Sequence, residues 1–241
     1  MFNTTRIISA LVMIGAIIII ALIDQFFINF IVFAVLLYLS FSEAKKLFAL
    51  ENISIIPLAI AFILGSLSHK ALLFGILALL LVVGYLVYKK ASLKPALIYI
   101  YPSLPILALW QVYLDQGMFA LFWLIIIVAA CDSGAYFIGK LMGKTPFSPT
   151  SPNKTLEGVI GGLICASVIG TILGNFVYSF WLSLLCSFFV AIFAVIGDLF
   201  ESYFKREAGV KDSGDLIPGH GGVLDRIDAV IIAAFVMVTF L

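Results

Sequence analysis

Apolar residues fill most of the chain in runs that charged or polar residues interrupt at short intervals. A bilayer-spanning helix needs about 20 predominantly apolar residues, so runs of this order are candidate spans. Nine such runs cover about 7–23, 26–42, 53–68, 71–88, 96–114, 118–138, 158–178, 180–200 and 228–241. The pattern predicts an all-α, polytopic integral membrane protein of about nine transmembrane helices.

Composition strengthens this interpretation. Of the 241 residues, 63% are hydrophobic and 11% are charged, against roughly 45–50% apolar and about 25% charged residues in soluble domains. A water-soluble globule is excluded, and no separate soluble domain fits between the runs. We expect an N-terminal region of about five transmembrane helices over 1–117. A C-terminal catalytic region, 118–241, would carry polar loops at 139–157 and 201–227.

The distribution of basic residues predicts the orientation of the chain. If the N-terminus is cytoplasmic, the loops on that side carry 13 of the 14 Lys and Arg residues, with Lys70 as the exception. Such a bias is expected of cytoplasmic loops in membrane proteins. It places both polar loops on the cytoplasmic face, where they can share a site.

Charge is concentrated near the C-terminus. Eleven of the 27 charged residues lie between Asp198 and Asp228, and seven of these are acids. If the helix over 180–200 continues, Asp198, Glu201, Ser202 and Lys205 share one face.

Asp225 and Asp228 are likewise three positions apart, at the start of the last run. The chain reverses before them through Pro218-Gly-His-Gly-Gly, whose glycines allow close backbone approach to a ligand. Carboxylates from two helix ends, without a His or Cys cluster, favour Mg²⁺ over zinc. The alternative is a salt-bridged hairpin that binds no ligand.

The first polar loop offers donors for phosphate oxygens. Ser151, Asn153 and Lys154 lie in a proline-containing segment, and such donors suit a phosphate chain. The plainer interpretation is a helix-entry turn in which Thr155 caps the helix and Glu157 lies in its first turn.

Two further features lie within the apolar runs. Asp132 is a functional candidate because it is ionisable and within a span, although it could simply reach interfacial water. The seventh run has a small residue at every fourth position, which indicates close helix packing. These residues are Gly158, Gly162, Ala166, Gly170 and Gly174.

The C-terminal motifs resemble the phosphatidate cytidylyltransferase family, also called CDP-diacylglycerol synthases. The family signature runs Ser, two residues, Lys-Arg, four residues, Lys-Asp-Ser-Gly, a variable position, Leu-Ile-Pro-Gly-His-Gly-Gly, two residues, Asp-Arg-Ile-Asp. Ser202 to Asp228 match it throughout, with Asp215 at the variable position. Cys131–Tyr136 and Ser151–Thr155 are also similar to family motifs, so the resemblance covers about 130–230.

The resemblance implies transfer of a cytidylyl group from CTP to phosphatidate, which gives CDP-diacylglycerol and pyrophosphate in phospholipid biosynthesis. It implies Mg²⁺ as cofactor and leaves open whether a second cation joins it. The metal residues would be Asp198, Asp225 and Asp228. The catalytic residues would be Asp198, Asp225, Lys205 and Arg206. The substrate-binding residues would be Ser151, Asn153, Lys154, Ser202, Lys211, Asp212, His220, Gly221, Arg226 and Asp132.

Partners and location follow from the expected substrates. CTP would arrive from the cytoplasm, whereas phosphatidate would keep its acyl chains in the bilayer. We expect an integral protein of a bacterial inner membrane with its active site on the cytoplasmic face and no nucleic-acid partner; a homodimer stays open. Two other functions remain: a CTP-dependent lipid kinase similar to dolichol kinase, and a transporter.

Overall fold

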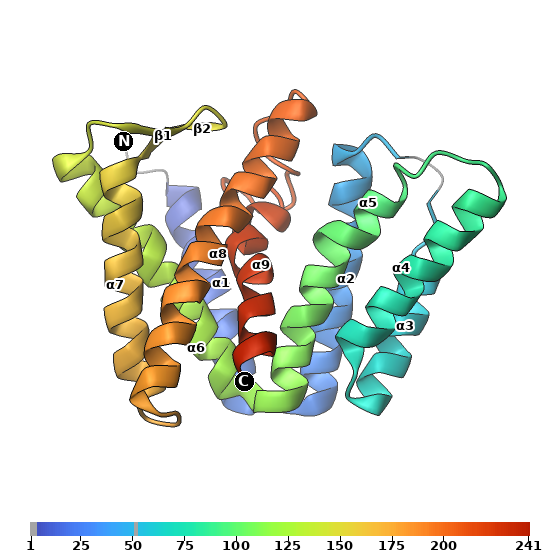
Figure 1. Ribbon diagram of the computed structural model, residues 1–241, viewed down its shortest axis with the longest axis horizontal. Coiled ribbons are helices and arrows are strands. Elements are labelled where there is room, and N and C mark those ends of the chain that lie inside the picture. Colours follow the sequence, from blue (N-terminus) through green and yellow to red (C-terminus); the bar gives the residue numbers. More distant parts are fainter. Residues whose placement is uncertain (1–3, 51–52) are drawn as a thin grey trace. The chain divides into compact units, whose positions relative to one another are not determined.

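Helices form nearly all of the regular structure in this computed structural model, which describes residues 4–50 and 53–241, with side chains from Ile8 onward. The helices are α1 (Thr4–Ile23), α2 (Phe26–Leu47), α3 (Ile56–Ser68), α4 (Ala71–Tyr88), α5 (Ala96–Ile98), η1 (Tyr99–Ser103), α6 (Leu104–Met142), α7 (Leu156–Gly174), α8 (Phe180–Glu207) and α9 (Leu224–Phe240). Two short strands, β1 (Pro146–Ser148) and β2 (Ser151–Thr155), pair as an antiparallel hairpin (Figure 1).

Every predicted apolar run contains a helix. Within the described residues, five helical segments are long and apolar enough to cross a membrane: Phe26–Leu47, Ala71–Tyr88, Ala96–Met142, Leu156–Gly174 and Phe180–Glu207. A helical integral membrane protein is therefore supported. The count of about nine spans and the cytoplasmic N-terminus stay predictions.

Helix boundaries differ from the sequence pattern where polar residues continue a helix. Helix α8 runs on to Glu207, so the beginning of the predicted loop 201–227 is helical. Helix α6 runs to Met142, and the hairpin, which periodicity did not predict, occupies the rest of the first polar loop. Gly117, at φ 73° and ψ −169°, interrupts α6 between the two runs that the sequence separates there.

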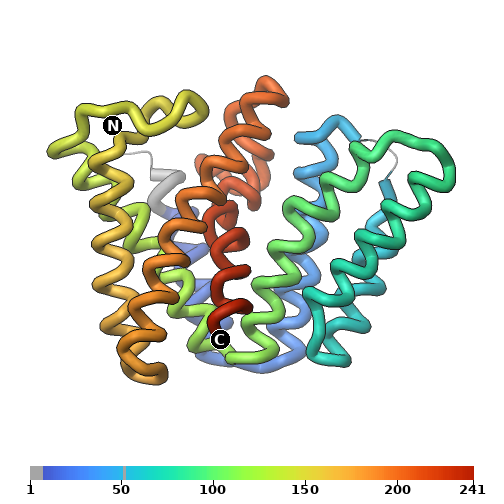
Figure 2. Tube along the Cα trace, viewed as in Figure 1, coloured from blue at the N-terminus to red at the C-terminus, as the bar shows by residue number. Residues whose placement is uncertain are grey.

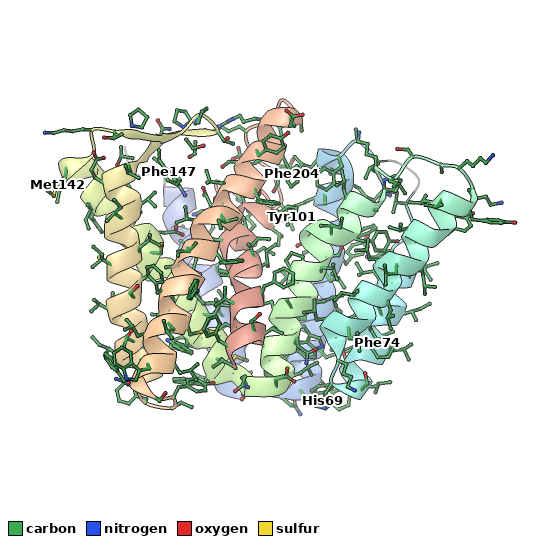
Figure 3. All side chains as sticks on the ribbon, viewed as in Figure 1. His69, Phe74, Tyr101, Met142, Phe147 and Phe204 are labelled. Carbon is green, nitrogen blue, oxygen red and sulfur yellow. The ribbon has the colours of Figure 1, made fainter. Side chains whose placement is uncertain are left out.

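The chain forms two compact units. The first comprises 1–118 and 207–227, and the second comprises 119–206 and 228–241. In the first unit, α3 and α4 pack as a helical hairpin with His69 in its turn (Figure 3). Its core includes Trp110, whose ring centroid lies 4.9 Å from that of Phe33 and 5.7 Å from that of Phe62. The predicted division into 1–117 and 118–241 stays a prediction.

In the second unit, α7 and α8 run side by side in opposite directions (Figure 2). The small residues of α7 are buried. A Cβ atom on Gly162 would lie 2.6 Å from the Cys131 carbonyl oxygen in α6, and one on Gly174 would lie 2.6 Å from Ser183 Oγ in α8. The predicted packing role of the small-residue stripe is confirmed. The stripe holds α7, the helix that directly follows the hairpin, against α6 and α8.

Candidate active site

One group of predicted residues gathers at the end of α8, in the second unit. Because α8 continues past Asp198, the acids Asp198 and Glu201 and the base Lys205 come to one helix face. Lys205 Nζ lies 3.2 Å from Glu201 Oε2, and the Glu201 side chain is 1% exposed. Ser202 is half-buried on the same helix, whereas Arg206 is exposed in its last turn.

Residues from three other elements join this face. Lys154 Nζ, from β2, lies 2.6 Å from Asp198 Oδ2. Asp228, near the start of α9, lies close enough to Glu201, Asp198 and Lys205 to interact with them electrostatically. Asp132 of α6 lies within electrostatic range of Lys154, Asp198 and Asp228. We call Asp132, Asp198, Glu201 and Asp228 the carboxylate cluster.

The hairpin is tied to the entry of α7. Thr155 is the helix cap, since its Oγ1 accepts a hydrogen bond from the Gly158 amide at 3.2 Å. Glu157, in the first turn, accepts bonds from the Lys144 amide at 3.1 Å and from Thr145 Oγ1 at 2.8 Å. The interpretation of this segment as a helix-entry turn is thus confirmed for Thr155 and Glu157. The same turn also holds β2 in place, the strand from which Lys154 reaches the carboxylate cluster.

The other two residues expected from this loop are less enclosed. Ser151 is half-buried opposite Ser148 in the hairpin, and Asn153 is exposed. Their roles as donors to substrate stay predictions.

A second group of predicted residues lines a cavity of about 480 Å³ in the first unit. This volume lies in the range typical of small-molecule sites. We call it the signature cavity, because its walls come from the signature segment. Five of its lining residues are predicted substrate-binding residues: Lys211, Asp212, His220, Gly221 and Arg226.

A tight turn shapes one wall of the signature cavity. The Ile217 amide donates to the Gly221 carbonyl at 2.8 Å, and Gly221 has φ 84°, which favours glycine. Arg226 Nε donates to the His220 carbonyl at 3.1 Å, so the guanidinium is held against the turn. His220 Nδ1 is buried and has no hydrogen-bond partner among the described residues.

Asp225 follows this turn and is held rigidly. Its Oδ2 accepts hydrogen bonds from the Gly222 amide at 2.7 Å, the Ser213 amide at 2.8 Å and Ser213 Oγ at 3.0 Å. A Cβ atom on Gly221 would lie 2.5 Å from the same oxygen. Asp225 therefore keeps one orientation, and the glycine is needed to make room for it.

The donor chemistry fits a hard divalent cation. With all groups ionised, the carboxylate cluster and the bases Lys154 and Lys205 carry a formal charge of −2, four acids against two bases. Carboxylate oxygens are ligands that Mg²⁺ favours. Between residues 4 and 241, leaving aside 51 and 52, no three His, Cys, Asp or Glu side chains are close enough to form a complete metal-binding group. The assignment of Mg²⁺ to Asp198, Asp225 and Asp228 stays a prediction.

Sequence reasoning missed Glu43 entirely and gave Glu201 no role. Glu43 lies near the end of α2, beyond the apolar run predicted to end at residue 42, and is 7% exposed. An acid followed by two lysines is an ordinary sequence for a solvated helix end. Its burial depends on what packs against it, which no local pattern reveals.

Comparisons with known proteins agree with these features. The sequence model of the Cytidylyltransferase family matches residues 4–241. A phosphatidate cytidylyltransferase of Helicobacter pylori (strain ATCC 700392 / 26695) is 41% identical over 199 residues, which are 80% of this chain and 75% of the relative. Proteins with the same name from Haemophilus influenzae and Bacillus subtilis are 48% and 43% identical over 122 and 121 residues. These two matches cover 47% and 48% of this chain, and 42% and 45% of the relatives.

The fold and the polar groups define a class, a helical integral membrane protein whose acids and bases gather at helix ends. The match over nearly the whole chain then identifies the family. The chain belongs to the cytidylyltransferase family and is a nucleotidyltransferase. The prediction of an enzyme is confirmed, and with it the resemblance drawn from the signature.

Proposed function

We propose that this enzyme transfers the cytidylyl group of CTP to phosphatidate and releases CDP-diacylglycerol and pyrophosphate. The observation that carries the proposal is the 41% identity to a protein named phosphatidate cytidylyltransferase, over 75% of that protein's length. The signature cavity supports it, because five residues expected to bind substrate line one space of about 480 Å³.

The proposed reaction needs position and charge more than a strong base. The second pKa of a phosphomonoester is about 6, so the phosphatidate phosphate is largely ionised at neutral pH. One of its oxygens attacks the α-phosphorus of CTP, and the bond from that phosphorus to the β-phosphate oxygen breaks. Lys154, Lys205 and Arg206 are the bases proposed to stabilise the phosphate charge.

The nucleotide is assigned to the signature cavity. Lys211 and Arg226 bring basic groups to its walls, beside the acids Asp212 and Asp215, and the His220 side chain also lines it. These groups suit the oxygens of a triphosphate and the polar edge of a base.

Magnesium is proposed to be held mainly by Asp198 and Asp225, the pair that the family resemblance favours, with Asp228 as a supporting residue. When bound, it would offset the repulsion between two anionic substrates and the charge that develops on pyrophosphate. The protein's own contribution is to keep these carboxylates in place. Lys154 does so for Asp198, and Ser213 and Gly222 do so for Asp225.

A cavity of about 390 Å³ in the second unit suits the lipid. Aromatic and aliphatic side chains of α8 line it together with the hydroxyls of Ser148 and Thr150 from the hairpin. Hydroxyls beside an apolar wall match the glycerol and first acyl carbons of phosphatidate. Phe204, one of the aromatic lining residues, is labelled in Figure 3. The proposed location is a bacterial inner membrane, with the active site on the cytoplasmic face.

Labelled CTP tests the reaction. Purified protein in mixed micelles of detergent and phosphatidate would be incubated with Mg²⁺ and CTP labelled on either the α- or the γ-phosphate. We expect α-label in a lipid product and γ-label in pyrophosphate. Transfer of γ-label to lipid, with release of CDP, would identify a lipid kinase instead.

The variant Asp198→Asn tests the metal assignment in the same assay. Loss of one carboxylate from the cluster should lower turnover by about 100-fold or more. Asp115→Asn is the matched control, since Asp115 is exposed and bonded to Gln111 of the same helix at 2.8 Å. Near-normal turnover of folded Asp198→Asn would contradict the assignment.

A further inference from the structure

Glu43 is a buried carboxylate in an unfavourable part of its own helix. It lies in the last turns of α2, where the carbonyl ends of the helix dipole disfavour negative charge. Its exposed fraction is 7%. A buried charge is retained only where other groups compensate it, so the side chain must have partners from elsewhere in the fold.

Those partners come from the signature segment, 170 or more positions away. The Val223 amide donates to Glu43 Oε1 at 2.8 Å, and the Leu224 amide donates to Oε2 at 2.9 Å. Leu224 is the first residue of α9. Amides in the first turn of a helix lack partners within the helix and carry its positive dipole end. The Glu43 carboxylate satisfies two such amides at once.

Ser213 links Glu43 to Asp225. Its Oγ lies 3.1 Å from Glu43 Oε2 and 3.0 Å from Asp225 Oδ2. A hydroxyl has one hydrogen and can donate to one carboxylate at a time. The two carboxylates therefore belong to one network, because the Ser213 hydroxyl lies within hydrogen-bond distance of both, and a displacement of Glu43 would reach Asp225 through Ser213.

The small residues of the signature segment make room for Glu43. A Cβ atom on Gly214 would lie 2.9 Å from Glu43 Oε1, and one on Gly222 would lie 2.5 Å from Oε2. Real Cβ atoms do not approach oxygen so closely, so these glycines allow the carboxylate to contact the backbone. Gly214 and Gly222 of the signature thus leave space for a carboxylate that comes from a helix distant in sequence.

We propose that Glu43 is a positioning residue of the nucleotide site. Its carboxylate anchors 213–224 and thereby holds the walls of the signature cavity and the orientation of Asp225. The anchoring follows from the contacts themselves. Its effect on catalysis rests on the proposed function.

The variant Glu43→Gln tests this in the full-length protein, purified in nanodiscs. The amide group of Gln cannot accept hydrogen bonds at both ends, so one of the two backbone donors loses its acceptor. We expect hydrogen exchange at the Val223 and Leu224 amides to accelerate by about 10-fold or more. The KM for CTP should rise by a similar factor, while the KM for phosphatidate stays within about twofold.

Glu207→Gln is the matched control, because Glu207 is exposed at the end of α8. It should leave exchange in 211–224 and both KM values unchanged. Unchanged exchange in Glu43→Gln would overturn the proposal, as would an equal rise in both KM values with a lower unfolding temperature, which would show a general structural role.

Ser213→Ala carries the test if Glu43→Gln does not fold. It keeps both backbone donors to Glu43 and the bond from the Ser213 amide to Asp225, and removes only the hydroxyl that lies between the two carboxylates. A raised KM for CTP with a normal KM for phosphatidate would support the proposal, and unchanged values would contradict it. If the wild-type protein forms no lipid product from CTP, the proposed function fails, whereas the exchange measurement still decides the anchoring.

Discussion

At the scale of single residues, the Lys154–Asp198 ion pair has two expected roles, one in catalysis and one in the stability of the fold. The position of the pair allows the two roles to be measured separately. The two side chains lie 2.6 Å apart and are 26% and 29% exposed, so the pair is neither fully buried nor fully solvated. In this position the ammonium neutralises one carboxylate of the cluster and stays accessible to a phosphate group. We therefore expect Lys154 to matter more for catalysis than for folding.

Lys154→Gln should lower turnover by about 100-fold if Lys154 has the proposed role, since the substitution then removes a charge that stabilises phosphate oxygens. Stability should change by about 1 kcal/mol or less, because partly exposed ion pairs contribute little. Steady-state assays with CTP and phosphatidate, together with thermal unfolding, measure the two effects separately.

Lys144→Gln is the control for Lys154→Gln. Lys144 is an exposed lysine just before the hairpin, and its hydrogen bond to Glu157 is made by the backbone amide, which the substitution retains. Equal losses of turnover in the two variants would indicate that general positive charge on this loop, and not a contact by Lys154, matters.

At the scale of elements, close packing holds α7 against α6 and α8, and α7 in turn supports the hairpin that precedes it. Trp123 Nε1 of α6 donates to the Gly170 carbonyl of α7 at 2.7 Å, which is possible because no side chain stands between the two helices at that point. On its other side, a Cβ atom at Gly170 would lie 2.7 Å from the Ser187 Cβ of α8. Small residues at helix contacts of membrane proteins allow this approach.

Gly170→Leu should destabilise the protein by about 1–3 kcal/mol, because the added side chain must displace α6 or α8. Resistance to unfolding in mixed detergent micelles measures the effect. We expect activity to fall with the loss of folded protein.

Gly84→Leu is the matched control, because nothing lies within 4 Å of a Cβ atom at Gly84 in α4. Leu is also a better helix former than Gly by roughly 0.8–1 kcal/mol, so this variant should be neutral or slightly more stable. Equal destabilisation by the two substitutions would contradict the packing role of the α7 stripe.

At the scale of the whole molecule, the distribution of basic residues makes a prediction about topology. It places Pro149 and Asp215, in the two polar loops, in the cytoplasm and Lys70 on the opposite side of the membrane. All three residues are exposed. Each position can therefore report its side by chemical labelling.

One cysteine would be added at each of these positions in turn and labelled with a membrane-impermeant maleimide. Pro149→Cys and Asp215→Cys should react in inside-out vesicles and not in intact spheroplasts, and Lys70→Cys should show the reverse. The unsubstituted protein gives the background from its own three cysteines, of which Cys131 and Cys186 are buried and Cys165 is half-buried. Labelling of Pro149→Cys and Asp215→Cys from opposite sides would contradict a shared cytoplasmic face.

The amino-acid sequence by itself determined the class of protein, the order of its apolar helices and the motifs of its family. Those features are local: about 20 apolar residues have few alternatives to a membrane helix, and residues at i, i+3 and i+7 share a face of any helix. For this reason Asp198, Glu201 and Lys205 were placed together correctly once α8 was extended.

Only the tertiary structure decided which distant groups meet. Ser213 and Glu43 are 170 positions apart, and the exposed-looking end of α2 becomes buried because Val223 and Leu224 pack on it. Lys154 reaches Asp198 because small residues seat α7 closely against its neighbours. Such pairings depend on the packing of whole helices and on the cost of burying an unpaired charge, and neither has a local signal in the sequence.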